Sequence, residues 1–481
     1  MERNIVEEIV ERRKKDIAEK GFTFGYKIPE TRTRPVVPFM KEKGVILEIK
    51  KASPSKGDIA PDLNVTETAR KYRACGARAI SCLTEENYFK GSLQYLMDVC
   101  NAVDDVAVLR KDFLISEEEV EISYLCGADA VLLIAGILSP EKILSMAKKC
   151  KELGLSALVE VRTKEDAEKV LKVKQQYDDV IVCGVNSRNL KDFTIDLLVP
   201  ASMKKILGGK VIFESGITTP DAAEKIGAMG FHGILLGEAA AKNPENAVKY
   251  IEAFESSEEN LYGKTMVKMA EKIAGRKKPL VKICGLTRIE DVILAENLGA
   301  DFAGFIFSKK YGRNVYGPKF NAMRQELKKL KILKVAVITD VTGQEAEEAC
   351  FLVLKGELDF IQLHGISYDE VKAKNKKLLE NIPHYFAVTE KNGSIQEQMK
   401  VLYEKGEARV LVDSKNKDAL PANAKWIAGG INPENISSIM DRYNPELIDV
   451  SGGLEGSDIG IKDKAKIEKF FQVLNTQKYE V

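Results

Sequence analysis

An acidic and a basic residue stand two positions apart inside an apolar run near the start of the chain. The run, residues 45–50, reads VILEIK and contains Glu48 and Lys50. Because side chains alternate across a strand, these two charges share one face of it. A buried charge costs several kcal/mol unless it is paired and hydrogen-bonded. The pair therefore indicates either acid–base chemistry or, as the plainer alternative, an edge strand with one solvated face.

Further ionisable and amide residues follow other apolar runs in the first half of the chain. Lys111 ends one run, Glu160 lies late in another, Asn186 follows a third, and Glu214 and Ser215 end a fourth. If these runs are strands of a closed parallel barrel, their carboxyl ends meet in one pocket. A closed barrel has no edge strand, so the plainer alternative would then lose its basis. Together these residues form a candidate catalytic constellation.

Two glycines indicate what kind of ligand the pocket binds. Gly216 and Gly237 follow the last two runs of the first half. In a barrel, exposed backbone N–H groups and a short helix N-terminus at these two strand ends commonly hold a phosphate. Either glycine alone could be a simple turn residue, but the pair favours a phosphorylated ligand.

The elements that would position these residues recur along the whole chain. Short β-branched runs alternate with longer amphipathic segments rich in Lys and Glu, which is typical of β/α units around a parallel sheet. We predict an α/β protein of two tandem (β/α)8 TIM barrels, residues 1–255 and 280–481, joined by a helical linker over residues 256–279. The predicted strands are 45–50, 78–83, 106–111, 130–134, 157–161, 180–185, 211–215 and 233–237, then 280–284, 302–307, 334–338, 359–363, 384–388, 409–413, 425–429 and 447–451.

Composition excludes several classes of function. The 73 basic and 72 acidic residues leave a net charge of +1, which gives no reason to expect nucleic acid or an anionic membrane as a partner. Eight scattered cysteines suit reduced thiols, and the charged N-terminal segment indicates a surface helix rather than a signal peptide. No apolar run reaches the roughly 18 residues of a membrane span. We expect a cytoplasmic protein that binds small molecules, and a monomer, although the sequence leaves the oligomeric state open.

The motifs of the first half resemble, in order, those of indole-3-glycerol phosphate synthase. They read LEIKKASPSKGDI, LRKDF (109–113), LVEV (158–161), GVNSRNL (184–190), FESGI (213–217) and LLGEA (235–239). The resemblance covers about residues 1–255. It implies closure of carboxyphenylamino-deoxyribulose phosphate to indole-3-glycerol phosphate, with loss of carbon dioxide and water. Such a reaction explains the charges, because an acid must polarise a carbonyl and a hydroxyl must later leave with a proton.

The resemblance also implies a role for each matching residue. Lys111 would be the general acid with Glu160 as its partner, and Asn186 would bind near the reacting centre. Glu48 and Lys50 would serve the dehydration or position the substrate. Which lysine acts in which step stays open. The residues expected to bind substrate or phosphate are Ser53, Phe89, Glu214, Ser215, Gly216 and Gly237, with Phe89 packed on the anthranilate ring.

In the second half, a cysteine and an aspartate stand where catalytic groups are expected. Alternation puts Lys282 and Cys284 on the inner face of the first run, and Cys284 lies at its carboxyl end. A cysteine in an apolar strand is often inert filler. A thiol whose pKa is lowered by a neighbouring lysine could instead abstract a proton. Asp413, at the end of the sixth run, would be the acid opposite, with an exposed loop aspartate as the plainer interpretation.

Cys284 and Asp413 together resemble the base and acid of phosphoribosylanthranilate isomerase. Further matches over residues 280–481 are DFIQLHG (359–365), AGGINPENI (428–436) and IDVSGGLEGSDIGIKD (448–463). The resemblance implies an Amadori rearrangement, in which the ribosyl ring opens and a proton moves from C2 to C1 of the sugar, without a metal or redox cofactor. Arg313 would hold the anthranilate carboxylate. Gly430, Ser451 and Gly452 would cradle the phosphate, and His364 would lie near substrate or be structural.

One segment departs from this family's pattern. After the aspartate of the sixth strand the family carries Gly-Thr-Gly and then Phe-Asp-Trp, whereas this chain reads SKNKDALPANAKW (414–426). The main hypothesis remains a bifunctional tryptophan-pathway enzyme whose C-terminal barrel makes the substrate of the N-terminal one. One alternative is a monofunctional synthase with a non-catalytic second barrel. Another, two unrelated phosphosugar barrels, explains the glycines but not the ordered motifs.

Overall fold

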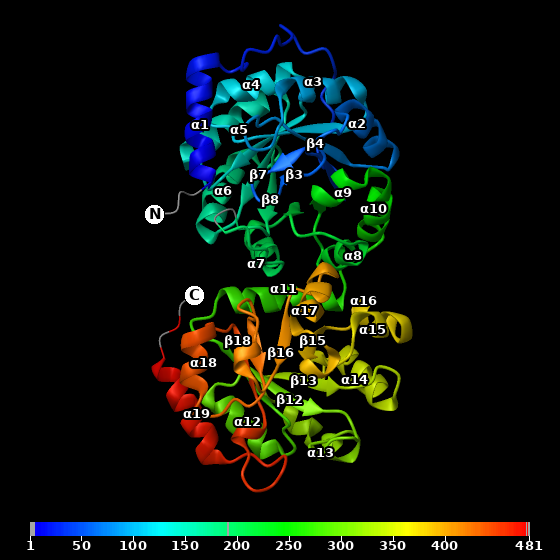
Figure 1. Ribbon diagram of the computed structural model, residues 1–481, viewed down its shortest axis with the longest axis vertical. Helices are drawn as coiled ribbons and strands as arrows, with labels where there is room; N and C mark the ends of the chain where they lie inside the picture. The colour runs from blue at the N-terminus through cyan, green and yellow to red at the C-terminus, as the bar shows by residue number, and fades with distance from the viewer. Residues whose placement is uncertain (1–4, 190–191, 478, 480–481) are drawn as a thin grey trace. The chain divides into compact units, whose positions relative to one another are not determined.

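Two compact units make up the chain, Met1–Glu259 and Asn260–Val481, and each contains a closed barrel of eight parallel strands. The structure is a computed structural model that describes residues 5–189, 192–477 and 479 (Figure 1). The predicted α/β fold with two (β/α)8 barrels is confirmed. Of the quoted motifs, only Leu190 of GVNSRNL lies outside the described residues.

The first barrel closes because its first strand pairs with both the second and the last. Its strands are β1 (Gly44–Ile49), β4 (Ala79–Leu83), β5 (Ala107–Lys111), β6 (Ala130–Ile134), β7 (Ser156–Val161), β8 (Ile181–Asn186), β9 (Val211–Glu214) and β10 (Gly233–Leu236). A small hairpin, β2 (Ala52–Ser53) and β3 (Gly57–Asp58), follows β1. The helices are α1 (Ile5–Lys20), α2 (Val65–Ala74), α3 (Leu93–Ala102), α4 (Glu117–Leu125), α5 (Pro140–Leu153), α6 (Lys164–Tyr177), α7 (Leu198–Leu207), α8 (Pro220–Ala228), α9 (Glu238–Lys242) and α10 (Ala247–Glu255).

The second barrel has the same topology. Its strands are β11 (Leu280–Cys284), β12 (Phe302–Ile306), β13 (Leu333–Ile338), β14 (Phe360–His364), β15 (His384–Thr389), β16 (Val410–Asp413), β17 (Trp426–Ala428) and β18 (Leu447–Val450). Its helices are α11 (Leu261–Ala274), α12 (Ile289–Leu298), α13 (Pro318–Leu327), α14 (Gln344–Leu354), α15 (Tyr368–Lys374), α16 (Lys376–Asn381), α17 (Ile395–Glu404), α18 (Ile436–Tyr443) and α19 (Lys464–Thr476). All sixteen predicted strands are present, and each end lies within one residue of its predicted position.

Helix α11 occupies the region predicted as a linker. It contacts α16 of the second unit, and the Asn260 side chain just before it donates a hydrogen bond to the Glu380 carbonyl at 2.8 Å. The contacts therefore group this helix with the second unit. The predicted domain boundaries stay a prediction.

Helix boundaries follow from residues that cap them. Helix α5 begins with Pro140 after Ser139, whose hydroxyl accepts the Lys142 N–H at 3.2 Å. It ends at Gly154, where φ is +72°, a left-handed conformation that glycine adopts without strain. Such caps recur at the ends of the outer helices, so the helix between two strands begins and ends at defined residues.

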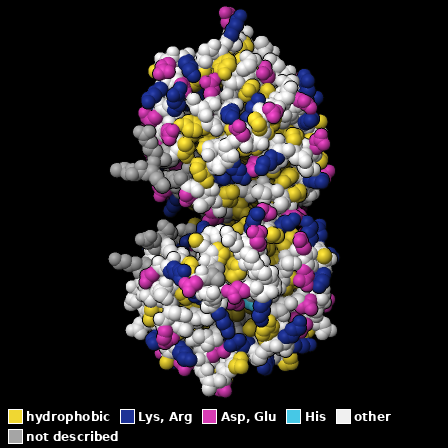
Figure 2. Space-filling view, viewed as in Figure 1, with side chains coloured by type: hydrophobic (Ala, Val, Ile, Leu, Met, Phe, Trp, Pro, Cys, Tyr) yellow, Lys and Arg dark blue, Asp and Glu magenta, His cyan; other side chains and the backbone are white. Residues whose placement is uncertain are grey.

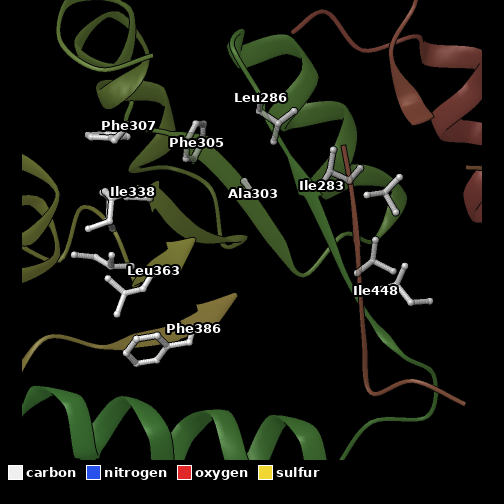
Figure 3. Packing of buried hydrophobic residues seen from close by; sticks show 14 of the residues in the cluster. Ile283, Leu286, Ala303, Phe305, Phe307, Ile338, Leu363, Phe386 and Ile448 are labelled. Carbon is white, nitrogen blue, oxygen red and sulfur yellow. The ribbon is translucent and has the colours of Figure 1, made fainter. Parts of the chain in front are cut away.

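Each unit is held together by apolar packing between its strands and helices. In the second unit, alternate strand residues such as Ile283, Phe305 and Phe386 are fully buried against the surrounding helices (Figure 3). Because Ile283 packs on the helix side of β11, its neighbours Lys282 and Cys284 face the barrel interior, as predicted. In the first unit, a cluster inside the barrel extends to Ile9 of α1.

The surface agrees with the balanced charge. Basic and acidic side chains are interspersed over the visible face of each unit, without a large area of one sign (Figure 2). Among the residues that the structure describes, no helix is both long and apolar enough to cross a bilayer.

Phe305 tests the packing of the second unit. Its ring is fully buried and meets Phe320 edge-on, with the ring centroids 5.5 Å apart. We expect Phe305→Ala to lower the free energy of unfolding of this unit by about 3–5 kcal/mol, because it leaves a cavity. Denaturant titration would measure the change. Phe351→Ala is the matched control: its side chain is 52% exposed, and we expect a change within about 0.5 kcal/mol.

Candidate active sites

A cluster of paired charges lies at the carboxyl ends of the strands in the first barrel. Lys111, at the end of β5, places its Nζ 2.9 Å from Glu214 Oε2 and 3.4 Å from Glu48 Oε2. The other Glu48 oxygen accepts a hydrogen bond from Lys50 Nζ at 3.0 Å. Glu48 therefore lies between two lysines, and both ions of each pair are largely shielded from water. Four residues of the constellation predicted from separate strand ends therefore form one connected ionic network: Glu48, Lys50, Lys111 and Glu214.

Mutual pairing and burial shift the pKa values of these groups. Burial alone would raise the pKa of Glu48, but Lys50 and Lys111 outweigh it and lower that pKa below its ordinary value. Burial alone would lower the pKa of Lys111, but Glu214, Glu48 and Glu160 outweigh it and raise that pKa. In the free site Glu48 is thus a carboxylate and Lys111 an ammonium ion.

Glu160 behaves differently. Burial and the facing carboxylate of Glu214 raise the pKa of Glu160 to about 7. The Glu214 Oε1 atom is buried, and it has no hydrogen-bond partner among the described residues. Two carboxyl groups this close disfavour double ionisation, so one of the pair tends to keep a proton at neutral pH. Glu160 is consequently the group of this site that can both give and accept a proton near pH 7.

These residues line a cavity of about 470 Å³ at the mouth of the barrel. The residues predicted from the sequence that line it are Glu48, Lys50, Ser53, Phe89, Lys111, Glu160, Asn186, Ser215, Gly216 and Gly237. Glu214 does not line the cavity; it lies behind Lys111 as its ion-pair partner. That Glu214 binds substrate stays a prediction; in the free site its carboxylate holds Lys111.

The glycines stand where a larger side chain would collide. A Cβ atom at Gly237 would lie 2.8 Å from Glu48 Oε1. Ser215 and Gly216 both have positive φ, at +69° and +77°, which turns the backbone sharply after β9. The Ser215 carbonyl is held by the Ser187 hydroxyl at 3.0 Å. Backbone N–H groups can therefore approach a bound anion closely on this side of the cavity.

Several lining residues were missed by the sequence analysis. Arg188 and Phe113 both fall within quoted motifs and both line the cavity. Ile5, Val6 and Ile9 of α1 line it as well. The prediction of a surface helix was incomplete, because only the outer face of α1 is exposed. The helical spacing of its apolar residues indicated that α1 has a buried face, but the sequence could not show that this face covers the cavity.

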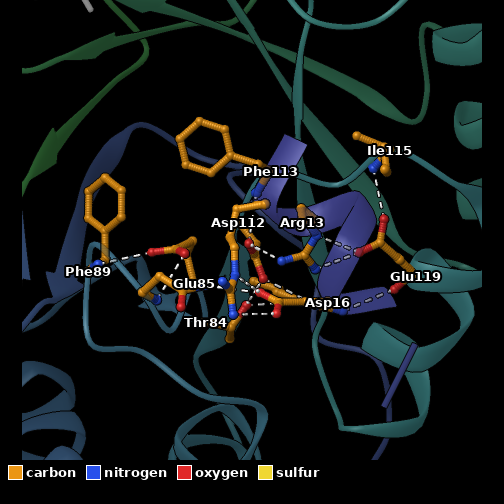
Figure 4. A network of polar contacts seen from close by, with 12 residues as sticks. Arg13, Asp16, Thr84, Glu85, Phe89, Asp112, Phe113, Ile115 and Glu119 are labelled. Atoms are coloured by element: carbon orange, nitrogen blue, oxygen red, sulfur yellow. Dashed lines mark hydrogen bonds and ion pairs between the residues drawn. The ribbon is translucent and has the colours of Figure 1, made fainter. Parts of the chain in front are cut away.

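A buried polar network fastens α1 to the barrel (Figure 4). Arg13 is 5% exposed and donates from Nη1 to Asp112 Oδ1 at 2.7 Å and from Nε to Glu119 Oε1 at 2.7 Å. Asp112 directly follows Lys111, and its second oxygen pairs with Arg110 at 3.2 Å. Through Asp112, the helix that covers the cavity is linked to the strand end that carries Lys111.

In the second barrel, Lys282 and Cys284 face the interior as predicted. Lys282 is fully buried and donates to Gln362 Oε1 at 2.7 Å and to Asp449 Oδ2 at 2.5 Å. Burial raises the pKa of Cys284, and Lys282 opposes this only in part. Lys282 does lower this pKa, as the sequence analysis considered, but burial outweighs its effect in the free site. Cys284 is only 8% exposed, and Asp449 also raises its pKa.

Asp413 lies at the same end of the barrel, at the carboxyl end of β16. Its Oδ2 atom is 4.0 Å from His364 Nε2, and the aspartate side chain is one-third exposed. Strand register places Asp413 beside Thr389 of β15 and Ala428 of β17. His364 thus lies next to the proposed acid.

Arg313 is already paired in the structure. Its Nε and Nη2 atoms contact the two carboxylate oxygens of Glu455 at 2.6 and 2.7 Å. A Cβ atom at Gly285, directly after Cys284, would lie 2.5 Å from Arg313 and 3.0 Å from Ser451 Oγ. A Cβ atom at Gly452 would lie 3.2 Å from Arg313 Nη2. The structure therefore brings Arg313 to the mouth beside the cysteine, with its guanidinium fork held by Glu455.

The remaining residue predicted to hold phosphate is Gly430, which has a φ of +63° and lies just after β17. Its neighbour Gly429 packs against Asp413, since a Cβ atom there would lie 2.7 Å from Asp413 Oδ1. Gly430 thus directly follows a glycine that packs against Asp413. Among the described residues, no group of three or more His, Cys, Asp or Glu side chains could hold a metal ion.

Comparison with protein families accounts for both barrels. The family model of indole-3-glycerol phosphate synthase matches residues 6–253, more than half of the chain. The chain belongs to this synthase family. The model of N-(5′-phosphoribosyl)anthranilate (PRA) isomerase matches residues 281–473 of the second unit. We therefore refer to the synthase unit and the isomerase unit.

Curated relatives match either the first half of the chain or nearly all of it. The indole-3-glycerol phosphate synthase of Lachnoclostridium phytofermentans is 40% identical over 44% of this chain and 75% of its own length. The tryptophan biosynthesis protein TrpCF of Haemophilus influenzae is 28% identical over 89% of this chain and 86% of its own. The multifunctional tryptophan biosynthesis protein of Schizosaccharomyces pombe is 28% identical over 98% of this chain, which spans only 66% of that relative.

The Arg13 network predicts a coupled loss of stability and activity in the synthase unit. Arg13→Met leaves the buried carboxylates of Asp112 and Glu119 without their common cation, which should cost about 3–5 kcal/mol of unfolding free energy. Ring closure should slow because α1 loosens over the cavity. Denaturation and synthase kinetics would measure both. Lys14→Met, on the exposed face of α1, should change neither; equal effects of the two variants would contradict this role of Arg13.

Glu160 predicts a pH-dependent change in stability. Folded Glu160 keeps its proton to about pH 7, whereas its ordinary pKa is 4.5. Its contribution to stability is therefore fully present below pH 4.5 and is lost as the pH rises through 7. Relative to wild type, Glu160→Gln should become more stable by about 2–3 kcal/mol between pH 4.5 and pH 8. Unfolding free energies at both pH values test this, with the exposed Glu168→Gln as the control.

Proposed function

We propose that the chain catalyses two successive steps of tryptophan biosynthesis. The isomerase unit would convert N-(5-phosphoribosyl)anthranilate to carboxyphenylamino-deoxyribulose 5-phosphate, and the synthase unit would close that product to indole-3-glycerol phosphate. The observation that carries the proposal is the ion cluster of Lys111, Glu48 and Glu214 beside Glu160, in a cavity that also contains Gly216 and Gly237. It provides charge for a carbonyl and backbone donors for a phosphate in one place.

In the synthase unit, each proton movement has a suitable group. Lys111 is a largely buried cation held by Glu214 and Glu48, so it can polarise the substrate carbonyl while the new ring bond forms and the carboxyl group leaves as carbon dioxide. The hydroxyl produced must then depart as water. Glu160, with a pKa of about 7, can supply or remove the proton for that step.

In the isomerase unit, the reaction needs one base and one acid. We assign Asp413 as the acid for ring opening and Cys284 as the base that removes the proton from C2 of the sugar. The free thiol keeps its proton, so a thiolate must form after substrate binds. Arg313 supports this view: when an anthranilate carboxylate displaces Glu455 from its guanidinium fork, the charges around Cys284 rearrange.

The remaining features of the proposal follow from chemistry already described. The substrates are small phosphorylated molecules, and neither reaction as proposed routes a step through a metal or redox cofactor. We infer a cytoplasmic location from the eight cysteines, which are all free thiols. The monomeric state stays a prediction.

The alternative is a synthase whose second barrel is not catalytic. The altered loop after Asp413 is the observation in its favour, since the family pattern is lost there. Against it stand Cys284, Asp413 and Arg313, which the second barrel brings to one mouth.

A coupled assay on the full chain separates the two possibilities. Supplied with phosphoribosylanthranilate, the wild type should release indole-3-glycerol phosphate. Lys111→Ala should accumulate the isomerised intermediate and lose ring closure by at least 10²-fold, because a positioned acid is worth about 10²–10⁴ in rate. Cys284→Ser should leave phosphoribosylanthranilate unconverted and still close the intermediate when it is added directly.

Each variant is the control for the other unit. If wild type closes the intermediate but never isomerises phosphoribosylanthranilate, the second barrel is not catalytic. If Lys111→Ala closes the ring at nearly the wild-type rate, Lys111 has no part in the mechanism.

A further inference from the structure

The loop after β16 holds an unusual lysine. In the isomerase family pattern this loop is Gly-Thr-Gly, but here it contains Lys417 at the start of the short helix η3 (Lys417–Ala419). The side chain of Lys417 turns back toward the barrel and is only partly exposed. Its position raises the question of what holds this loop in place without the family's glycines.

Lys417 joins the ends of two neighbouring strands. Its Nζ donates to the Ser414 carbonyl at 2.6 Å and to the Ala428 carbonyl at 2.5 Å. Ser414 directly follows Asp413, and Ala428 directly precedes Gly429 and Gly430. The Ala428 carbonyl lies at the end of the β16–β17 ladder, and the Ser414 carbonyl lies just beyond it. Backbone donors are few at this point, and the Ser414 N–H contacts the Ala428 carbonyl only at 3.4 Å. The ammonium group of Lys417 therefore supplies hydrogen bonds to the two carbonyls where the backbone ladder ends.

Contacts around Lys417 leave little room for movement between Asp413 and the glycines. A Cβ atom at Gly429 would lie 2.5 Å from the Ser414 carbonyl oxygen and 2.7 Å from Asp413 Oδ1. The Tyr443 hydroxyl donates to the Lys417 carbonyl, and the Ser414 hydroxyl donates to the Glu390 carboxylate beyond β15. Three successive strand ends are thus tied together, with Lys417 at the centre.

The electrostatic environment agrees with this geometry. Burial lowers the pKa of Lys417 to about 8, although Asp413 and Glu390 favour its charged form. An ammonium group pays this desolvation cost only where it has good acceptors. Lys417 has them in the two carbonyls.

We propose that Lys417 is a positioning residue of the isomerase unit, which holds the acid Asp413 and the segment of Gly429 and Gly430, where Gly430 belongs to the predicted phosphate cradle, at a fixed separation. It takes over the role of a Gly-Thr-Gly turn with a side chain that bridges two strand ends. The inference rests on the proposed isomerase function for its catalytic consequence, but the bridge itself is a property of the fold.

The experiment compares Lys417→Met with Lys417→Arg in the full chain. Methionine keeps the length of the side chain but cannot donate, so kcat/KM for phosphoribosylanthranilate should fall about 10–100-fold, because small displacements of a reacting group cost on this order. The loss should include kcat as well as KM, since the acid and the cradle shift relative to each other. Arginine can donate to both carbonyls and should restore most of the activity. Ring closure by the synthase unit, measured in the same sample, should not change.

Hydrogen exchange provides a second readout that is independent of turnover. In Lys417→Met, amides of residues 411–431 should exchange faster, and those of the synthase unit should not. Lys400→Met, an exposed lysine on α17, is the matched control for loss of charge. Wild-type kinetics with unchanged exchange in Lys417→Met would overturn the inference. A wild-type chain without isomerase turnover would instead refute the proposed function, and the exchange result would then decide the bridge alone.

Discussion

Closure of eight parallel strands is the constraint on which both sites depend. Because β1 pairs with β4 and with β10, the carboxyl ends of all eight strands of the first barrel face one opening. Glu48, Lys111 and Glu214 are far apart along the chain, and only this closure brings them within ion-pair distance. The same topology in the second barrel brings Cys284 and Asp413 to one mouth. The chemistry is therefore a consequence of strand order and of polar residues placed at strand ends.

Concentrating charges in these mouths has an energetic cost that the fold must offset. Glu214 Oε1 and Asp449 Oδ1 are buried without a hydrogen-bond partner among the described residues, and Glu160 is held next to another carboxyl group. Such arrangements lower stability, and they persist where a site needs groups with altered pKa values. The apolar layers between strands and helices supply the compensating free energy.

Much of this could be predicted from the sequence because strands and their ends have strong local signals. The β-branched runs located all sixteen strands, and alternation assigned Lys282 and Cys284 to the barrel interior. The predicted site residues of the first barrel line one cavity, apart from Glu214. What the sequence could not show depends on contacts between distant segments: the docking of α1 through Arg13, the pairing of Arg313 with Glu455, and the burial that raises the pKa of Cys284. None of these three features leaves a pattern within one short stretch of the sequence.

The position of α1 has a practical consequence for work on this protein. Ile5, at the first turn of that helix, is part of the wall of the synthase cavity. Shortening α1 would therefore remove part of the cavity wall as well as part of the surface. Kinetic comparisons between preparations are best made with this helix intact.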